Sequence, residues 1–188
     1  MKNIGEVRFV GLQNVSESDL EAVRLMRNHG EVRKYMYTNH LISKEEHASW
    51  VRRMQESETV KLFVIYRGEK PIGLVSLSKI SLRHSTAEWA FYLDPGEQGS
   101  GVGVVVEYAL LEYAFCEIGI CKLNCEVLET NPNVVKLHKK FGFMEEGFRR
   151  SNILRDGQRI GVHLLGLTTS EWAVGKPRFK KIISRYGG

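Results

Sequence analysis

The 188-residue chain lacks the long apolar run that a membrane-spanning protein needs. Its apolar stretches are far shorter than the about 20 consecutive residues that cross a bilayer as a helix. The first residues, MKNIGEVRFVG, contain no apolar core and no cleavage pattern, so they do not resemble a secretory signal. We therefore expect a cytoplasmic protein that does not use a membrane as a partner.

Cysteine is scarce as well. The chain has only three cysteines, Cys116, Cys121 and Cys125, and their number and spacing match neither a disulfide framework nor a zinc site. We expect reduced thiols and no bound metal. With 43% apolar and 26% charged residues, the composition is that of an ordinary globular protein long enough to bury one core.

Acidic residues are missing from one segment, near the C-terminus, and this accounts for the net charge of +5. Without the five basic residues of that segment, the remaining basic residues equal the 22 acidic ones. We therefore divide the chain into a domain over residues 1–175 and a basic, solvated tail over 176–188. Nucleic-acid binding by this tail is the alternative, and we predict none. The five residues are Lys176, Arg178, Lys180, Lys181 and Arg185.

The periodicity of apolar residues predicts alternating strands and helices. The order is one strand, two helices, three strands, a helix, a strand, a helix and two strands, which indicates an α/β or α+β fold with a mixed sheet. Apparent capping boxes at Ser18 and Ser43 open the first two helices. The predicted strands cover residues 7–12, 62–66, 71–80, 88–93, 122–128, 143–154 and 159–168, and Asp156-Gly157 forms the turn between the last two. The later helices cover 103–117 and a short segment after Asn131.

The stretch from Pro95, PGEQGSGVGVVVEYALLEYAF, places three glycines before an apolar helix. Glycines let a ligand approach the backbone amides, and a helix N-terminus attracts anions, phosphates above all. The spacing G-x-G-x-G differs from the G-x-G-x-x-G of dinucleotide-binding folds, and no P-loop lysine follows. A glycine-rich turn that only serves helix–strand packing is the alternative interpretation.

The spacing Gln98-x-x-Gly101-x-Gly103 resembles the Q/R-x-x-G-x-G/A signature of the GNAT acetyltransferases. The resemblance extends from about residue 7 to 168 and implies a single-domain GNAT acyl-CoA N-acyltransferase fold with acetyl-CoA as co-substrate. It also implies that the backbone of Phe91, Tyr92 and Leu93 pairs with the pantetheine arm. The amides implied to cradle the pyrophosphate are those of Gln98, Gly99, Ser100, Gly101, Val102 and Gly103.

Downstream, EVLETNPNVVKLHKKFGF resembles the family block E-x-x-x-x-N-x-x-A-x-x-x-Y-x-x-x-G-F. The resemblance implies that Glu126 is the general base, that Asn131 contacts the coenzyme, and that His138 stands where the family commonly has a tyrosine general acid. An amine must lose a proton before it attacks a thioester, and a carboxylate can accept that proton. The alternatives are that the carboxylate of Glu126 only pairs with a residue of a neighbouring strand and that His138 only packs in the core. Since neither Cys116 nor Cys125 lies in an electropositive setting, we expect direct transfer.

The N-terminal third contains the segment RNHGEVRKYMYTNHLISKEEHASW. The helical spacing predicts that Arg27 points inward, where its guanidinium suits a carboxylate or phosphate. The aromatic and methionine side chains around His47 provide flat surface suited to a base or a sugar ring. A structural ion pair and an ordinary core are the alternatives. These side chains are Tyr35, Met36, Tyr37 and Trp50.

This segment resembles the R-N-H…W-M-Y…H…F pattern of the UDP-amino-sugar N-acetyltransferases of pseudaminic acid biosynthesis, whose sugars commonly decorate flagellin. Residues 73–80, GLVSLSKI, are similar to that group's G-x-G-S-I-T-K-I strand. The resemblance implies acetylation of the 4-amino group of a UDP-linked amino-dideoxy sugar; Val75 and Glu88 depart from the pattern and leave the exact sugar open. It implies nucleotide contacts from Arg27, His47, Ser78, Lys79 and Tyr92, a sugar pocket of Met36, Tyr37 and Trp50, and a catalytic Ser76.

Two other functions remain open from the sequence. A GNAT enzyme with a ribosomal-protein N-terminus or a polyamine as acceptor has the same coenzyme motifs. A non-catalytic sensor that only binds acetyl-CoA would also keep the glycine turn. The partners that we expect are acetyl-CoA and a UDP-amino sugar, and the chain alone leaves open whether it forms a homodimer.

Overall fold

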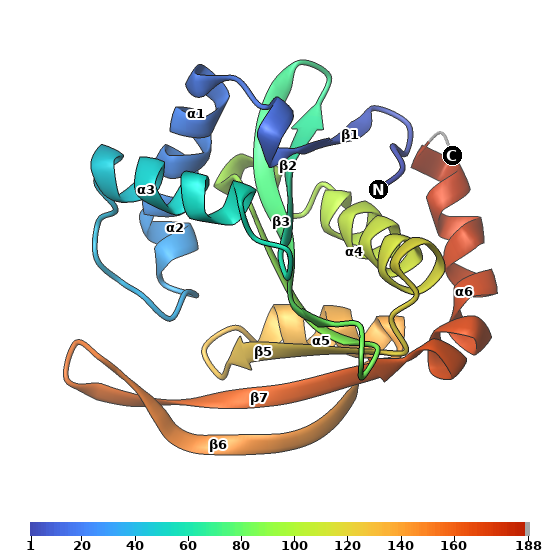
Figure 1. Cartoon of the computed structure of the whole chain (residues 1–188). Coiled ribbons are helices and arrows are strands. Elements are labelled where there is room, and N and C mark those ends of the chain that lie inside the picture. The colour runs from blue at the N-terminus through green and yellow to red at the C-terminus, as the bar shows by residue number, and fades with distance from the viewer. Residues whose placement is uncertain (187–188) are drawn as a thin grey trace.

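A seven-stranded sheet runs through the molecule, with helices on both of its faces (Figure 1). The computed structural model describes residues 1–186. Strands lie in the order β1-β2-β3-β4-β5-β7-β6. The strands are β1 (Val7–Gly11), β2 (Lys61–Arg67), β3 (Lys70–Ser81), β4 (Thr86–Leu93), β5 (Lys122–Leu128), β6 (Met144–Arg155) and β7 (Gln158–Thr168).

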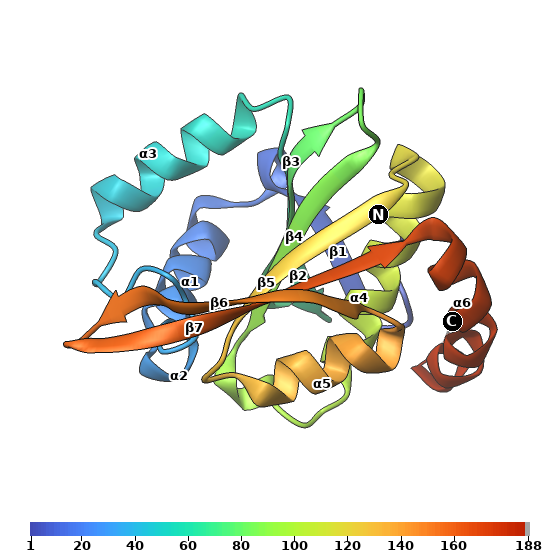
Figure 2. The same ribbon diagram turned by 90° about the horizontal axis from the view of Figure 1, so that it is seen from below.

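The helices divide between the two faces of the sheet. Those of the N-terminal third pack on one face, and the later three pack on the other (Figures 1 and 2). None of the helices within residues 1–186 has the length and apolar character needed to cross a bilayer. The first group is α1 (Glu17–Asn28), α2 (Gly30–Arg33) and α3 (Lys44–Gln55), and the second is α4 (Val102–Glu112), α5 (Pro132–Phe141) and α6 (Thr169–Ile183).

One strand pair breaks the antiparallel pattern of the sheet. β4 and β5 run parallel, and they pair only over Thr86–Glu88 and Lys122–Asn124. Past these residues β4 stays paired with β3, and β5 stays paired with β7. The sheet therefore splits between β4 and β5, at the end of the pair that faces the loop before α4.

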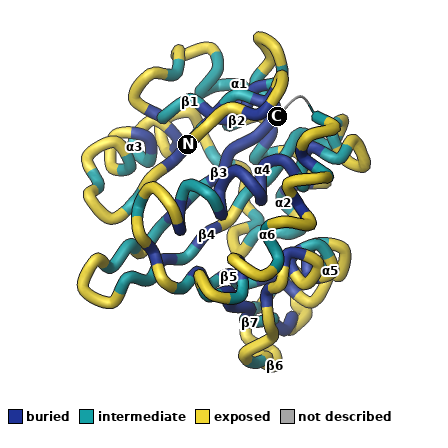
Figure 3. Tube along the Cα trace, turned by 90° about the vertical axis from the view of Figure 1, so that its right-hand side faces the viewer, coloured by how far each residue is buried: buried dark blue, intermediate teal, exposed yellow. Residues whose placement is uncertain are grey.

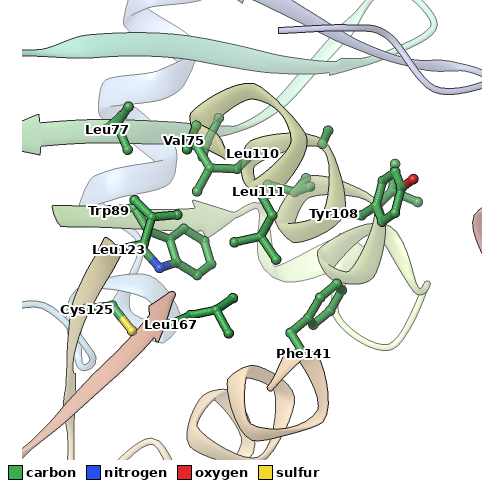
Figure 4. Packing of buried hydrophobic residues seen from close by; sticks show 14 of the residues in the cluster. Val75, Leu77, Trp89, Tyr108, Leu110, Leu111, Leu123, Cys125, Phe141 and Leu167 are labelled. Carbon is green, nitrogen blue, oxygen red and sulfur yellow. The ribbon is translucent and has the colours of Figure 1, made fainter. Parts of the chain in front are cut away.

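The main core lies between the sheet and α4, α5 and α6. In Figure 3, α4 is buried along most of its length, which explains why its sequence is apolar on nearly every side. Figure 4 shows Leu110 and Leu111 of this helix beside Trp89 and Leu123 of the sheet. A smaller core lies under α1 and α3 on the opposite face.

Most predicted elements are confirmed within one or two residues, including the turn at Asp156 and Gly157, where both φ angles are positive (47° and 78°). The predicted cap of the first helix is wrong. Ser16, not Ser18, has the extended backbone of an N-cap, and its Oγ accepts from the amide of Asp19 at 3.2 Å. The second predicted cap, Ser43, is confirmed.

The C-terminal segment differs from the solvated tail expected from its charge. Residues from Lys176 onward continue α6 to Ile183, and a capping box at Thr168 and Glu171 opens this helix. Phe179 and Ile183 are buried in the main core. The basic residues of the segment therefore lie on the outer face of a packed helix, because the apolar residues between them turn inward.

Candidate active site

The split between β4 and β5 leaves backbone groups without a strand partner. On β4 these belong to Trp89–Leu93, along the edge that faced β5 before the strands separated. Unpaired N–H and C=O groups at a strand edge recognise an extended amide chain, as an added strand would. Phe91, Tyr92 and Leu93, the residues expected to pair with the pantetheine arm, all lie in this stretch.

The glycine turn lies directly before α4, as the sequence predicted. Gly99 and Gly101 adopt positive φ angles of 79° and 86°, and Gly101 is the N-cap of α4 without any side-chain cap. Among the first amides of α4, that of Val102 donates to Ser100 Oγ at 3.3 Å and that of Val104 donates to the carbonyl of Gly101 at 3.0 Å, so within residues 1–186 the amide of Gly103 is left available to an anion. A Cβ added to Gly101 would collide with the hydroxyl of Tyr186. The turn therefore requires glycine at position 101.

Glu126 lies on β5 just beyond the split. Its side chain is 25% exposed, on the sheet face covered by α1 and α3. The hydroxyl of Tyr37 donates to Oε2, and Arg149 donates to Oε1 at 2.6 Å. Burial and the adjacent carboxylate raise the pKa of Tyr37, so this hydroxyl keeps its proton.

His138 lies on the opposite face of the sheet from Glu126. Its side chain is buried in α5, and its Nδ1 lies 3.0 Å from Oε1 of Glu107, a fully buried residue of α4. The ring packs against Trp89 at 4.8 Å and Phe143 at 5.5 Å between centroids. Glu126 and His138 therefore approach the split from its two sides. Asn131, at the N-cap of α5, makes no side-chain cap bond.

Arginines gather beside the predicted acceptor residues. Arg27 is half-buried; its Nη2 donates to the hydroxyl of Thr38 at 2.8 Å, while its Nη1 is buried and has no partner within residues 1–186. Burial lowers the pKa of Arg27, as do the positive charges of Arg33 and Arg155, while Tyr92 opposes this effect. Each of these two neighbours also has a buried Nε without a partner in the described chain.

The other predicted acceptor residues lie in two places. His47 is buried, which lowers its pKa, and it stacks on Trp50 with 5.4 Å between ring centroids. On β3, the left-handed residue Lys79 pairs with Glu88 at 2.8 Å. Ser78 lies opposite Glu88 in the β3–β4 register, and the hydroxyl of Ser76 donates to the carbonyl of Ala90 at 3.2 Å.

Arg155 joins two segments that are far apart in the sequence. Its guanidinium donates to the carbonyls of Lys34 and Met36 in the segment after α2. Asn39 in the same segment donates to Asp156 at the hairpin tip, at 3.1 Å. The β6–β7 hairpin thus holds the segment that carries Met36 and Tyr37 in place (Figure 1).

Sequence reasoning missed four charged residues of this region. Arg33, Arg149 and Arg155 stand in polar stretches that read as solvent-exposed, so nothing local identifies them. Glu107 carried a usable signal, because a lone carboxylate within VVVEYALL must be buried and therefore needs a partner.

The chain matches the model of the acetyltransferase (GNAT) domain over residues 10–144. It belongs to the GNAT family. This GNAT protein is an N-acetyltransferase, and its co-substrate is acetyl-CoA. The split strands and the glycine turn are the elements that suit this coenzyme.

Relatives of two kinds accompany this GNAT enzyme. Acetyltransferase PseH of Campylobacter jejuni is 27% identical over 138 residues, 72% of the chain and 85% of that protein. Spermidine N(1)-acetyltransferase of Vibrio cholerae is 27% identical over 162 residues, 86% and 94% of the two chains. A crystal structure of the Vibrio cholerae spermidine N-acetyltransferase with CoA and spermine superposes with a TM-score of 0.82 at 23% identity, covering 89% of this chain and 98% of that one. This likeness shows the shared fold.

Proposed function

We propose that this GNAT enzyme transfers the acetyl group of acetyl-CoA to the 4-amino group of a UDP-linked amino-dideoxy sugar. The arginine cluster of Arg27, Arg33 and Arg155 carries the proposal. Each guanidinium has a buried nitrogen without a hydrogen-bond partner in residues 1–186, and the charges lie close enough to lower the pKa of Arg27. Guanidinium groups so arranged are complementary to a diphosphate.

The acidic residues on this face argue in the same direction. Glu88 is paired with Lys79, Glu126 with Arg149, and Glu46 contacts His40 at 2.8 Å. A polyamine is a polycation and needs unpaired carboxylates along its binding groove. Here the cations have unused hydrogen-bonding groups, while these carboxylates already have partners.

The proposed base is Glu126, which accepts a proton from the attacking amine as the nitrogen bonds to the acetyl carbon. Tyr37 and Arg149 hold its two oxygens and so fix the carboxylate at the split. Ser76 lies on the same face as Trp50, and we assign the sugar pocket to Met36, Tyr37 and Trp50. Burial and the nearby Glu107 raise the pKa of Cys125 well above its ordinary value, which favours direct transfer over an acyl-enzyme.

The nucleotide end of the substrate is assigned to the face below α1 and α3. Half-buried Trp50, which stacks on the buried His47, offers a flat aromatic surface for the base. Lys79 and Ser78 at the β3 bulge and Tyr92 under α1 complete the proposed contacts with the nucleotide. The pyrophosphate would take the unpaired nitrogens of the arginine cluster.

A polyamine is the second candidate acceptor, because the matched spermidine acetyltransferase covers more of the chain than PseH does. The test is release of coenzyme A thiol from acetyl-CoA with three acceptors: a UDP-4-amino-4,6-dideoxy sugar, spermidine and a ribosomal-protein N-terminal peptide. We expect turnover on the nucleotide sugar. The Arg33→Ala variant should raise the KM for that sugar about tenfold or more, the value of one lost charge-assisted contact.

Arg178→Ala provides the matched control, because this arginine lies on α6, on the other side of the molecule from the acceptor face (Figure 1). It should leave the KM unchanged. Turnover on spermidine or the peptide alone would refute the proposed acceptor and keep the acetyl transfer. Coenzyme binding without turnover on any amine would favour a sensor.

A further inference from the structure

A buried carboxylate in the coenzyme half of the molecule has no role in the chemistry described so far. Glu107 lies in the middle of α4 with no exposed surface (0%). Its Oε1 contacts His138, but Oε2 has no hydrogen-bond partner in the described part of the chain. A carboxylate in such a site is costly unless its charge is balanced. The pair must therefore be treated as one titrating unit.

The pair can hold its protons in few ways. Both side chains are buried, so a net negative charge on the pair, with an ionised Glu107 beside a neutral His138, is disfavoured. Burial accordingly raises the pKa of Glu107, while His138 opposes the rise. One further proton makes the pair neutral, either as carboxylate beside imidazolium or as carboxylic acid beside neutral imidazole. In the first state both ring nitrogens carry hydrogen. In the second, Nδ1 accepts from the acid, so the ring hydrogen is on Nε2. Both neutral states therefore present an N–H at Nε2.

The surroundings leave this nitrogen as the open end of the pair. Nε2 of His138 and Oε2 of Glu107 both have no hydrogen-bond partner in residues 1–186. Oε2 is fully enclosed, whereas Nε2 keeps some accessible surface. The ring packs on Trp89 and lies 6.4 Å from the ring of Phe91, and both residues follow the split on β4. Cys125 of β5 is the other ionisable group that meets the pair, and its raised pKa keeps it a neutral thiol. Figure 4 shows Cys125 and Trp89 on neighbouring strands.

We propose that Glu107 and His138 form one proton-donating unit, in which Nε2 of His138 protonates the departing coenzyme A thiolate and Glu107 keeps that proton in place. This inference rests on the proposed acetyl transfer. As the amine nitrogen bonds to the acetyl carbon, the carbon–sulfur bond breaks and its electron pair goes to sulfur. The Nε2 proton moves to sulfur, and the proton of the amine moves to Glu126. Water then reprotonates the pair and accepts the proton from Glu126, so the cycle balances. Glu107 is thus a positioning residue that acts through His138.

The decisive experiment is a double-mutant cycle on the rate of a single turnover, measured from neutral to alkaline pH. Glu107→Gln removes the charge that retains the proton and should lower the rate about 10- to 100-fold, the lower part of what general acid catalysis contributes. The loss should grow toward alkaline pH. His138→Tyr supplies a phenol, a neutral donor that needs no carboxylate. In that background Glu107→Gln should change the rate by less than about threefold.

Equal losses from Glu107→Gln in both backgrounds, or a pH profile that does not change, would overturn the proposal. The assay uses whichever amine the wild type acetylates, so a wrong acceptor assignment does not affect it. If Glu107→Gln fails to fold, nitrogen NMR of the wild type with isotope-labelled histidine decides the question. The His138 signal is assigned by its loss in His138→Tyr. A protonated Nε2 at neutral pH is expected, and an unprotonated Nε2 would refute the inference.

Discussion

Replacing Arg155 tests whether the hairpin holds the acceptor segment in place. Its guanidinium donates to the carbonyls of Lys34 and Met36, so Arg155→Ala removes two charge-assisted hydrogen bonds. Such bonds contribute about 1.5–3 kcal/mol each, and we take a total of about 2–3 kcal/mol, no more than the minimum for two such bonds, because the segment is partly exposed. At about 1.4 kcal/mol per factor of ten, the KM for the acceptor should rise about 30- to 100-fold.

The assay is steady-state thiol release with acceptor and acetyl-CoA varied separately. Arg155→Lys retains the charge but cannot span two carbonyls, so it should raise the KM for the acceptor nearly as much as Arg155→Ala does. Arg159→Ala, on the same hairpin and exposed, is the control and should stay within about twofold of wild type. An unchanged acceptor KM, or an equal rise in the KM for acetyl-CoA, would refute the role of Arg155.

Three further changes test separate parts of the structure. Glu126→Gln should lower kcat about 10²- to 10⁴-fold while calorimetry finds acetyl-CoA still bound, and a smaller loss would contradict a general base. Gly101→Ala forces a side chain into φ 86° and against Tyr186, so the KM for acetyl-CoA should rise at least tenfold, whereas Gly30→Ala has open space and should not alter it. Phe179→Ala should cost about 3–5 kcal/mol in urea unfolding, because Phe179 is 4% exposed and stacks on Phe141 at 3.9 Å. A loss below about 1 kcal/mol in the free energy of unfolding would contradict the packing of the C-terminal helix against the core.

The features predicted correctly from the sequence depend on residues close together in the chain. Ser43, the glycine turn and Asp156-Gly157 each determine a backbone conformation within a few residues, and each lies where predicted. The first helix shows the limit of this reasoning, because its predicted cap was Ser18 and its observed cap is Ser16. Both serines satisfy the spacing of a cap, and the choice depends on which one has the extended backbone.

The features that sequence reasoning missed depend on contacts between distant residues. Arg155 and Met36 are 119 positions apart, and only the β6–β7 hairpin brings them together. The basic residues after Lys176 suggested solvation, since charge dominates that segment. Phe179 and Ile183 nevertheless pack the helix onto the main core, because a helix needs only a stripe of apolar residues to do so.

The alternation of side chains along β4 has a practical consequence for protein engineering. Trp89 and Phe91 face the Glu107–His138 pair, while Glu88, Ala90 and Tyr92 face the side of α1 and α3. The edge assigned to the coenzyme consists of backbone groups, whose hydrogen bonding does not depend on the side chains of β4. A library that randomises positions 88 and 90 could therefore explore new acceptors while retaining acetyl-CoA recognition. One strand thus offers a variable surface and a constant one, separated by a single residue step.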